Sequence, residues 1–410
     1  MPMSTPHAPP RKPTPSAQRG RRSSHDRRPL EHLHQWLSAA DREVLWLYLL
    51  TRVGIWTTAG AVGWLFPPNR TDRIPRSFLT VWQQWDWWHF LHIAQGGYFP
   101  NHTGPWTPGW DNREAFFPGF PLTLRAVHTL IPHWAASGAL ISLVSGAVAA
   151  LTLARIARHH LTDPDSGRRT ALFFLLSPCA VFLAAGYTEA LFLALALPAW
   201  HAAQHHKWPA AAVLTTLSCS VRVTGLFLAS ALLLHFFLTG REHRSWRAAP
   251  WLALPALPPA LYFWYLHVHT GDWMAWKHAQ ERGWYRDFHT PWEAWANTWT
   301  AAFGHTQPTG NALMWQAELL AMLAGIALLV LLVRRRHFPE ALYLGLTLYA
   351  LGTSYWYTSI PRSTLLWWPL WIVLAGWSLR RPRVQALYFY AAGPLTTIVA
   401  ITFLTGRWAG

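Results

Sequence analysis

Residues 135–156 read AASGALISLVSGAVAALTLARI, an apolar run that is long enough to cross the roughly 30 Å hydrocarbon core of a membrane. Similar runs recur at residues 44–66, 225–238, 251–267 and 313–333. One such run can be a buried core helix of a soluble protein, but so many runs cannot all be buried in one core. The pattern therefore predicts an all-α polytopic membrane protein, a bundle of about 11 transmembrane helices.

The composition agrees with lipid as the solvent, because 52% of the 410 residues are hydrophobic and only 13% are charged. The formal net charge of +16 would favour nucleic-acid binding in a soluble protein, but here basic residues fall between apolar runs, where they set orientation. Both cysteines lie inside apolar segments, and no P-loop, G-x-G-x-x-G or H-E-x-x-H pattern is present. We therefore expect no nucleic-acid partner, no metal and no cofactor.

The chain divides into two predicted parts. Residues 1–41, rich in Pro, Ser, Arg and His, are expected to form a disordered basic tail, and residues 42–410 the transmembrane domain. Clusters of arginine in alternate connections predict a multi-pass protein of the plasma membrane with a cytoplasmic N-terminus. The aromatic connections at about 67–115 and 270–311 then face outward. The first includes DWWHFLHIA at 86–94, which suits a helix lying in the membrane interface.

Five charged residues lie in or beside the outward ends of predicted spans: Asp86, Glu114, Glu189, Arg222 and Arg362. A charge at the centre of an inserted helix costs roughly 2.5 to 3.5 kcal/mol, so each needs a partner or a watery cavity. Carboxylates and guanidiniums that converge could bind an anionic group and move a proton. Structural roles stay open: Asp86 as a helix cap, Glu189 with Arg222 as an ion pair, and Arg362 as an anchor among lipid headgroups.

A resemblance to a known family rests on short motifs that occur in a fixed order. These are Trp85-Asp86 with His92-Ile93-Ala94 and Gly97-Tyr98, then Phe116-Phe117-Pro118-Gly119-Phe120-Pro121, Tyr187-Thr188-Glu189-Ala190-Leu191-Phe192, Arg222-Val223-Thr224-Gly225 and Ile360-Pro361-Arg362. Together, over about residues 45–380, they resemble the PIG-V-type mannosyltransferases. The resemblance implies a GT-C membrane glycosyltransferase, with interfacial helices in its outward loops, an acidic catalytic base in the first of these loops and a polyprenyl-phosphate sugar as donor.

Carried over residue by residue, the resemblance assigns a role to each candidate. Asp86 matches the loop acid and is the expected catalytic residue. Arg222 and Arg362 are expected to bind the phosphate of the donor. The expected substrate-binding residues are His89, His92, Glu114, Tyr187 and Glu189. Asp163-Pro164-Asp165 looks like the acidic pair that holds a metal and a nucleotide sugar in soluble glycosyltransferases, but it lacks a nucleotide-binding fold around it, so we interpret it as chance.

The expected function is inverting transfer of mannose from a polyprenyl-phosphate-mannose donor to a glycolipid, glycan or protein acceptor on the extracytoplasmic face. Membrane lipids are the other expected partners. Two alternatives remain: a membrane transporter or flippase of a lipid-linked or anionic substrate, and a non-catalytic GT-C subunit. A transporter needs charged or broken helices near the membrane midplane that are reachable from both sides. Here the candidate charges gather on one side of the predicted spans.

Overall fold

The computed structural model describes residues 37–66, 78–99, 112–240, 242, 244 and 246–410. It separates a unit Met1–Ala39 from a compact unit Ala40–Gly410, and the account below concerns the second unit. Most of the predicted tail lies outside the described residues. The described residues are helical and contain no β-strand, which confirms the all-α prediction.

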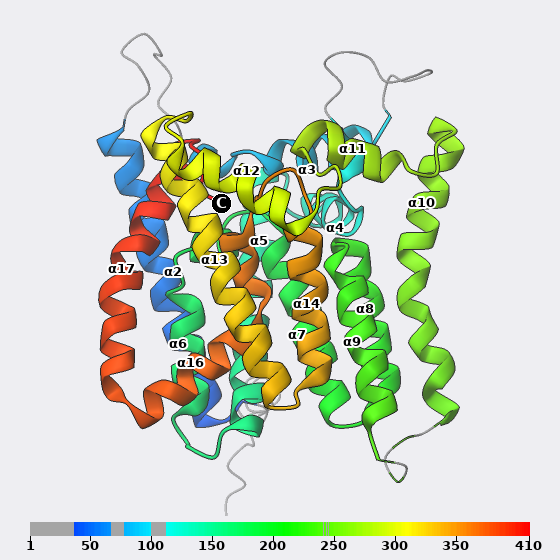
Figure 1. The fold of residues 1–410 in the computed structure, drawn as a ribbon, viewed down its shortest axis with the longest axis vertical. Coiled ribbons are helices and arrows are strands. Elements are labelled where there is room, and N and C mark those ends of the chain that lie inside the picture. The colour runs from blue at the N-terminus through cyan, green and yellow to red at the C-terminus, as the bar shows by residue number, and fades with distance from the viewer. Residues whose placement is uncertain (1–36, 67–77, 100–111, 241, 243, 245) are drawn as a thin grey trace, which may run out of the picture. The chain divides into compact units, whose positions relative to one another are not determined.

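The elements follow one another along the chain as α-helices with short 3-10 helices between them (Figure 1). They are α2 (Ala39–Leu65), η1 (Thr80–Trp82), α3 (Asp86–Gly96), η2 (Arg113–Ala115), α4 (Gly119–His128), α5 (Trp134–His160), α6 (Ser166–Leu175), η3 (Ala180–Leu183), α7 (Thr188–Gln204), α8 (Trp208–Val221), α9 (Thr224–Leu238), η4 (Trp246–Ala256), α10 (Leu257–Thr270), α11 (Ala275–Trp284), α12 (Pro291–Phe303), α13 (Thr309–Arg334), α14 (Phe338–Gly352), α15 (Ile360–Ser363), η5 (Thr364–Leu366), α16 (Trp368–Arg380) and α17 (Pro382–Leu404).

Among the described residues, three helices are long and apolar enough to cross a membrane, namely α5, α13 and α17. Helices α8 and α9 are apolar but shorter, and the count of about 11 spans stays a prediction. One face of α13 shows why a membrane suits this bundle. Leu313, Leu320, Leu323, Ile326 and Val330 are all exposed, although water would disfavour such a row. Lipid is a favourable solvent for this face.

Short helices gather at one end of the long ones, where α3, α11 and α12 lie in Figure 1; we call this the α3 end. Helix α3 contains the segment that the sequence predicts as an interfacial helix, and it ends where Gly97 adopts a φ of 76°. Helix α12 begins with Pro291, behind a capping box formed by Thr290 and Glu293. These connections are therefore built from ordered helices that can hold side chains in fixed positions.

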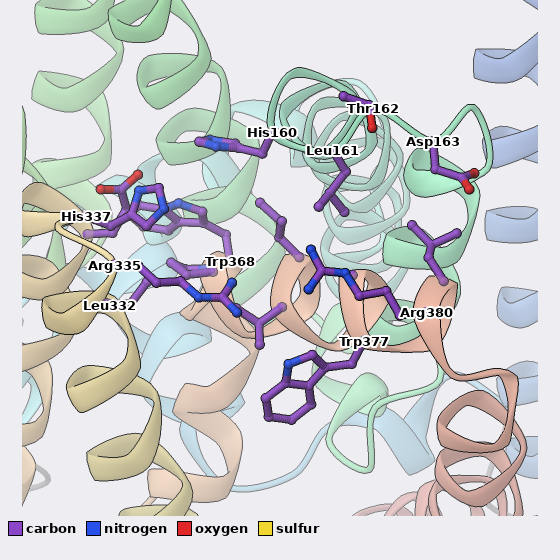
Figure 2. A pocket seen from close by; sticks show the side chains of 16 residues that line it. His160, Leu161, Thr162, Asp163, Leu332, Arg335, His337, Trp368, Trp377 and Arg380 are labelled. Carbon is purple, nitrogen blue, oxygen red and sulfur yellow. The ribbon is translucent and has the colours of Figure 1, made fainter.

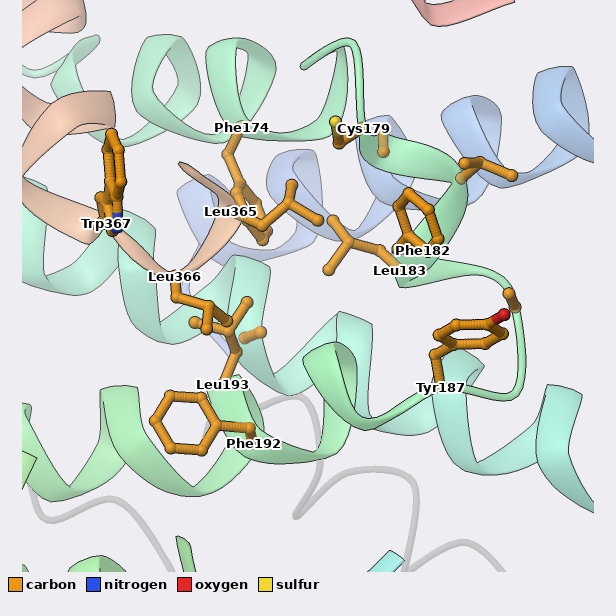
Figure 3. Packing of buried hydrophobic residues seen from close by; sticks show 14 of the residues in the cluster. Phe174, Cys179, Phe182, Leu183, Tyr187, Phe192, Leu193, Leu365, Leu366 and Trp367 are labelled. Carbon is orange, nitrogen blue, oxygen red and sulfur yellow. The ribbon is translucent and has the colours of Figure 1, made fainter. Parts of the chain in front are cut away.

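A buried apolar cluster extends through the helices and joins segments that are far apart in sequence (Figure 3). Phe174 of α6, Phe182 of η3, Leu193 of α7 and Trp367 after η5 are all almost completely buried in it. Tyr187, just before α7, belongs to the same cluster and carries a hydroxyl group. Close packing of this kind resists displacement, so the turns above it have a rigid base.

Trp87 fixes α3 on this base. Its side chain is only 1% exposed, and its ring fills a slot between Gly138 of α5 and Gly186 before α7. A Cβ atom added at either glycine would lie 2.5 Å from Cζ3 of Trp87. Only glycine at both positions leaves room for the indole. The fixed position of the Trp87 ring thereby also fixes the position of the neighbouring residue Asp86.

We expect Gly186→Ala to overpack this slot and to lower the stability by about 1 to 3 kcal/mol, because the rigid indole cannot move aside. Thermal unfolding in detergent would measure the change. Gly63→Ala in α2 is the matched control, since nothing lies within 4 Å of the added methyl group. In a helix that change is neutral or slightly stabilising. An unchanged melting temperature in Gly186→Ala would contradict the tight slot.

Candidate functional site

A cavity of about 870 Å³ lies at the α3 end, a size typical of small-molecule sites. Its walls come from α3, the turn before α7, the α8–α9 turn, the α11–α12 connection and the segment before α15. The charged or hydroxyl-bearing side chains that line it include Asp86, Tyr187, Arg222, Arg286 and Arg362. Segments from the whole length of the second unit therefore meet in one place.

Arg362 is the centre of an ion-pair network beside this cavity. Its Nη1 donates to Oδ2 of Asp86 at 2.8 Å, and its Nε donates to Oε1 of Glu189 at 2.6 Å. Nη1 of Arg222 donates to the same Glu189 oxygen at 2.5 Å and to Oγ1 of Thr188 at 2.7 Å. Glu189 is fully buried, so its charge is stabilised by two guanidinium groups in place of water.

Asp86 is the first residue of α3, and its side chain is 19% exposed. The N-terminus of a helix favours a carboxylate, and Arg362 favours it further. Trp85, which precedes it, has a φ of 50°, and its Nε1 donates to the backbone oxygen of Arg407 at 3.2 Å. The carboxylate is thus held in place, paired through one oxygen and still reachable from the cavity.

Tyr187 connects Arg362 to the start of α3. The guanidinium carbon of Arg362 lies 4.7 Å from the centre of the Tyr187 ring and 4.8 Å from that of Phe182, in cation–π geometry. The Tyr187 hydroxyl donates to the backbone oxygen of Gln84 at 2.6 Å. One aromatic side chain therefore sets the distance between the arginine and the turn that carries Asp86.

Glu318 of α13 holds the backbone turn that presents Arg362. Its two carboxylate oxygens accept the backbone N–H groups of Ser359 at 2.7 Å and Ile360 at 2.8 Å. Ser359 has a φ of 65°, in the left-handed region, so the turn is strained and needs this support. Sequence reasoning missed Glu318, although a lone carboxylate inside an apolar run is a signal of a functional or structural role.

We expect Glu318→Gln to lower the stability by about 1 to 3 kcal/mol, because an amide offers one acceptor oxygen where two N–H groups need one each. Hydrogen exchange of the Ser359 and Ile360 amides should become faster in the same variant. Glu43→Gln is a suitable control, since that carboxylate is more than half exposed. Unchanged exchange at both amides would show that Glu318 does not support the turn.

The structure separates the other predicted residues into two groups. His89 lines the cavity and stacks on Phe116, with ring centres 4.8 Å apart. His92 and Glu114 are outside the described lining of the cavity. Glu114 is fully buried and pairs with Arg282 at 2.9 Å, which is a structural contact between η2 and α11. Asp86, His89, Tyr187, Arg222 and Arg362 thus come together, with Glu189 beneath them.

A second cavity, of about 370 Å³, lies between the last turn of α13, the first turn of α14 and α16, at the opposite end of α14 (Figure 2). Arg335 and Arg380 extend into it from different sides, and Asp163 is on its wall. Asp165, the other acid of the Asp-Pro-Asp motif, forms ion pairs with Arg168 and Arg169 instead. The two acids of that motif are therefore not directed at a common ligand.

Helix α11 and the connection that follows it supply residues that sequence reasoning missed. Lys277 and Arg286 line the cavity at the α3 end, and Trp284 lines it beside them. Lys277 forms an ion pair with Glu281, one helical turn later. The sequence shows only that two basic residues lie in the aromatic connection that is predicted to face outward, and no motif distinguishes them.

Comparison with known proteins finds a family that matches part of this chain. Residues 45–244 match the family model of mannosyltransferase (PIG-V). The chain is 33% identical over 203 residues to GPI alpha-1,6-mannosyltransferase 2 of Mus musculus, covering 47% of this chain and 39% of the mouse protein. The protein of the same name from Homo sapiens is 34% identical over 172 residues, 40% of this chain and 33% of the human protein.

GPI mannosyltransferase 2 of Yarrowia lipolytica is 30% identical over 162 residues, 40% of each chain. The aligned segments thus span about a third to two-fifths of the relatives' own length. The range matched by the family model contains Asp86, Glu189 and Arg222. Residues 45–244 of this chain therefore match the PIG-V mannosyltransferase family, which supports the resemblance that the order of the sequence motifs predicted.

Proposed function

We propose that this protein is an inverting mannosyltransferase of GT-C architecture that uses a polyprenyl-phosphate-mannose donor. The observation that carries the proposal is the convergence of Asp86, Arg222 and Arg362 on one cavity, where the buried Glu189 pairs with both arginines. A carboxylate that is reachable from a cavity can accept a proton, and neighbouring guanidiniums can stabilise a departing phosphate. The choice of mannose as the sugar rests on the family match of residues 45–244.

The reaction follows from these groups. A hydroxyl oxygen of the acceptor attacks the anomeric carbon of mannose, and the bond from that carbon to the phosphate oxygen breaks on the opposite side. Asp86 takes the hydroxyl proton, and the polyprenyl phosphate leaves with the bonding electron pair. The positive charges of the cavity stabilise the negative charge that develops on the phosphate. Because attack and departure occur on opposite faces, the configuration at the anomeric carbon inverts.

The cavity walls suit the two substrates. Trp85, Trp88 and Trp284 line the cavity, and the faces of such rings pack on sugar rings. Phe227 and Leu351 extend the wall with apolar surface, which suits a prenyl chain. The names of the relatives refer to GPI mannosyl transfer, and we propose a glycolipid as the acceptor of this chain.

Access to the cavity favours an enzyme over a transporter. The cavity at the α3 end and the cavity at the far end of α14 have no lining residue in common among those described. We place the α3 end on the extracytoplasmic side of the plasma membrane, following the arginine clusters. Nucleotide sugars stay in the cytoplasm, so a transferase on the outer side needs a donor that is carried by a lipid.

The test is direct transfer. The protein, purified in detergent and mixed with labelled polyprenyl-phosphate mannose and a total lipid extract of the source membrane, should produce a labelled glycolipid. GDP-mannose in place of the lipid donor should give no product. Transfer from GDP-mannose alone would overturn the proposed donor, and the absence of any lipid-donor transfer would overturn the function.

A further inference from the structure

The basic residues that line the cavity at the α3 end are paired with carboxylates, except for one. Arg222 and Arg362 face the two carboxylates of Asp86 and Glu189, and all four are joined by ion pairs. Lys277 is paired with Glu281. Once these three cations have partners, the guanidinium of Arg286 is the remaining positive charge among the described lining residues.

Arg286 has no such partner. Its Nε atom is buried without a hydrogen-bond acceptor, and its side chain takes part in no ion pair within the described parts of the chain. Burial and the nearby guanidinium of Arg222 lower the pKa of Arg286 to about 10, which still leaves it protonated at neutral pH. Arg286 also lies close enough to Asp86 and Arg362 to interact with them electrostatically. A partly buried cation of this kind is stabilised when an anion binds beside it.

The backbone around Arg286 is fixed by three contacts. Nζ of Lys277 donates to the backbone oxygen of Arg286 at 3.2 Å. The backbone N–H of Tyr355 donates to the oxygen of Tyr285 at 3.3 Å, and that of His289 to the oxygen of Thr353 at 2.8 Å. The α11–α12 connection is therefore tied to the segment before α15. Arg286 is held in a fixed relation to Arg362 before any substrate arrives, as a binding group should be.

We propose that Arg286 binds the phosphate of the lipid-linked donor and then the departing polyprenyl phosphate. This inference rests on the proposed function and revises one part of the sequence prediction. Arg222 and Arg362 already have carboxylate partners, so their main role is to position Asp86 and Glu189. Arg286 contributes the charge that no carboxylate in the lining compensates, and a phosphate would supply the missing acceptor.

Binding of labelled polyprenyl phosphate to the detergent-purified protein tests Arg286 without any need for turnover. We expect Arg286→Gln to weaken binding by about 10-fold to 100-fold, the usual range for a lost hydrogen bond between charged groups. Arg286→Lys, which keeps the charge but not the planar fork, should lie between this variant and the wild type. Arg383→Gln, the same charge change at the exposed start of α17, is the control and should bind normally.

Three ligands distinguish the source of the anion. Polyprenyl phosphate should bind tightly to the wild type. Uncharged polyprenol should bind weakly, and to the same extent to the wild type and to Arg286→Gln. Inorganic phosphate should bind only weakly to both proteins. In the transfer assay, Arg286→Gln should raise KM for the lipid donor with KM for the acceptor unchanged. Polyprenyl phosphate that binds equally to wild type and Arg286→Gln would overturn the assignment of Arg286, whatever the transfer assay shows. Full transfer by Asp86→Asn would instead overturn the proposed mechanism and leave the binding result intact.

Discussion

Asp86→Asn is expected to transfer mannose about 10²-fold to 10⁴-fold more slowly than the wild type, the usual contribution of a general base. Asparagine has the same shape as aspartate, but its amide cannot take the proton of the acceptor hydroxyl. The loss should appear in kcat, because the amide oxygen can still accept the hydrogen bond from Arg362 that Asp86 accepts at 2.8 Å. Initial rates at saturating lipid donor measure the effect.

Asp163→Asn is the matched control for that prediction. It makes the same change in the only other acid pattern that suggested sugar transfer, on the wall of the cavity at the far end of α14. Transfer by Asp163→Asn should equal that of the wild type. If Asp163→Asn lost activity and Asp86→Asn kept it, the reaction would belong to the other cavity, and the proposed function of the α3 end would be wrong.

Some of the site could be predicted because the family motifs are local. Asp86, Glu189 and Arg222 each lie in a short stretch with a recognisable neighbourhood, and each falls within residues 45–244. Arg362 lies outside that range, and only the fold shows that it reaches Asp86, from which it is separated by 276 positions. The helical class was predictable for a similar reason, since hydropathy is a local property of the sequence.

The remaining features depend on contacts that no local pattern encodes. Glu114 and Asp86 look alike in the sequence, as acids among aromatic residues in one connection that is predicted to face outward. Packing brings Arg282 to Glu114 and buries it, whereas Asp86 stays 19% exposed beside the cavity. Arg286 belongs to no motif, and its importance follows from what its neighbours already bind. Tertiary packing decides which charged residues form pairs. The unpaired charge of Arg286 could therefore be found only in the structure.

The number of membrane-spanning helices also cannot be read directly from the sequence. Helix α6 has 10 residues and α8 has 14, both shorter than the roughly 20 that cross a membrane unaided. Pro198 lies inside α7 and Pro394 inside α17, where each removes a backbone hydrogen bond. Apolar runs in the sequence therefore overlap several shorter elements, and counting runs does not count spans.

Glu189→Gln should have the largest effect on stability among these substitutions. The fully buried carboxylate compensates Arg222 and Arg362 through a single oxygen, and a neutral amide would leave both guanidiniums close together without it. Breaking a buried ion pair by removing one partner typically costs about 3 to 5 kcal/mol. We expect the lower part of this range, since Arg222 is 25% exposed and Arg362 keeps its contact with Asp86. Thermal unfolding in detergent measures the loss, with Glu43→Gln as the exposed control.

The double variant Glu189→Gln, Arg222→Gln gives the sharper result, because it removes one positive charge together with the negative one. We expect it to be more stable than Glu189→Gln alone, so that the two substitutions are strongly non-additive. Stability should recover without transfer activity, because a neutral amide at position 189 has no negative charge to hold Arg362 in the orientation toward Asp86 that the carboxylate fixes at 2.6 Å. Additive destabilisation would show instead that Glu189 and Arg222 are neighbours without an energetic coupling. In that case the network would not be the device that holds the catalytic carboxylate in place.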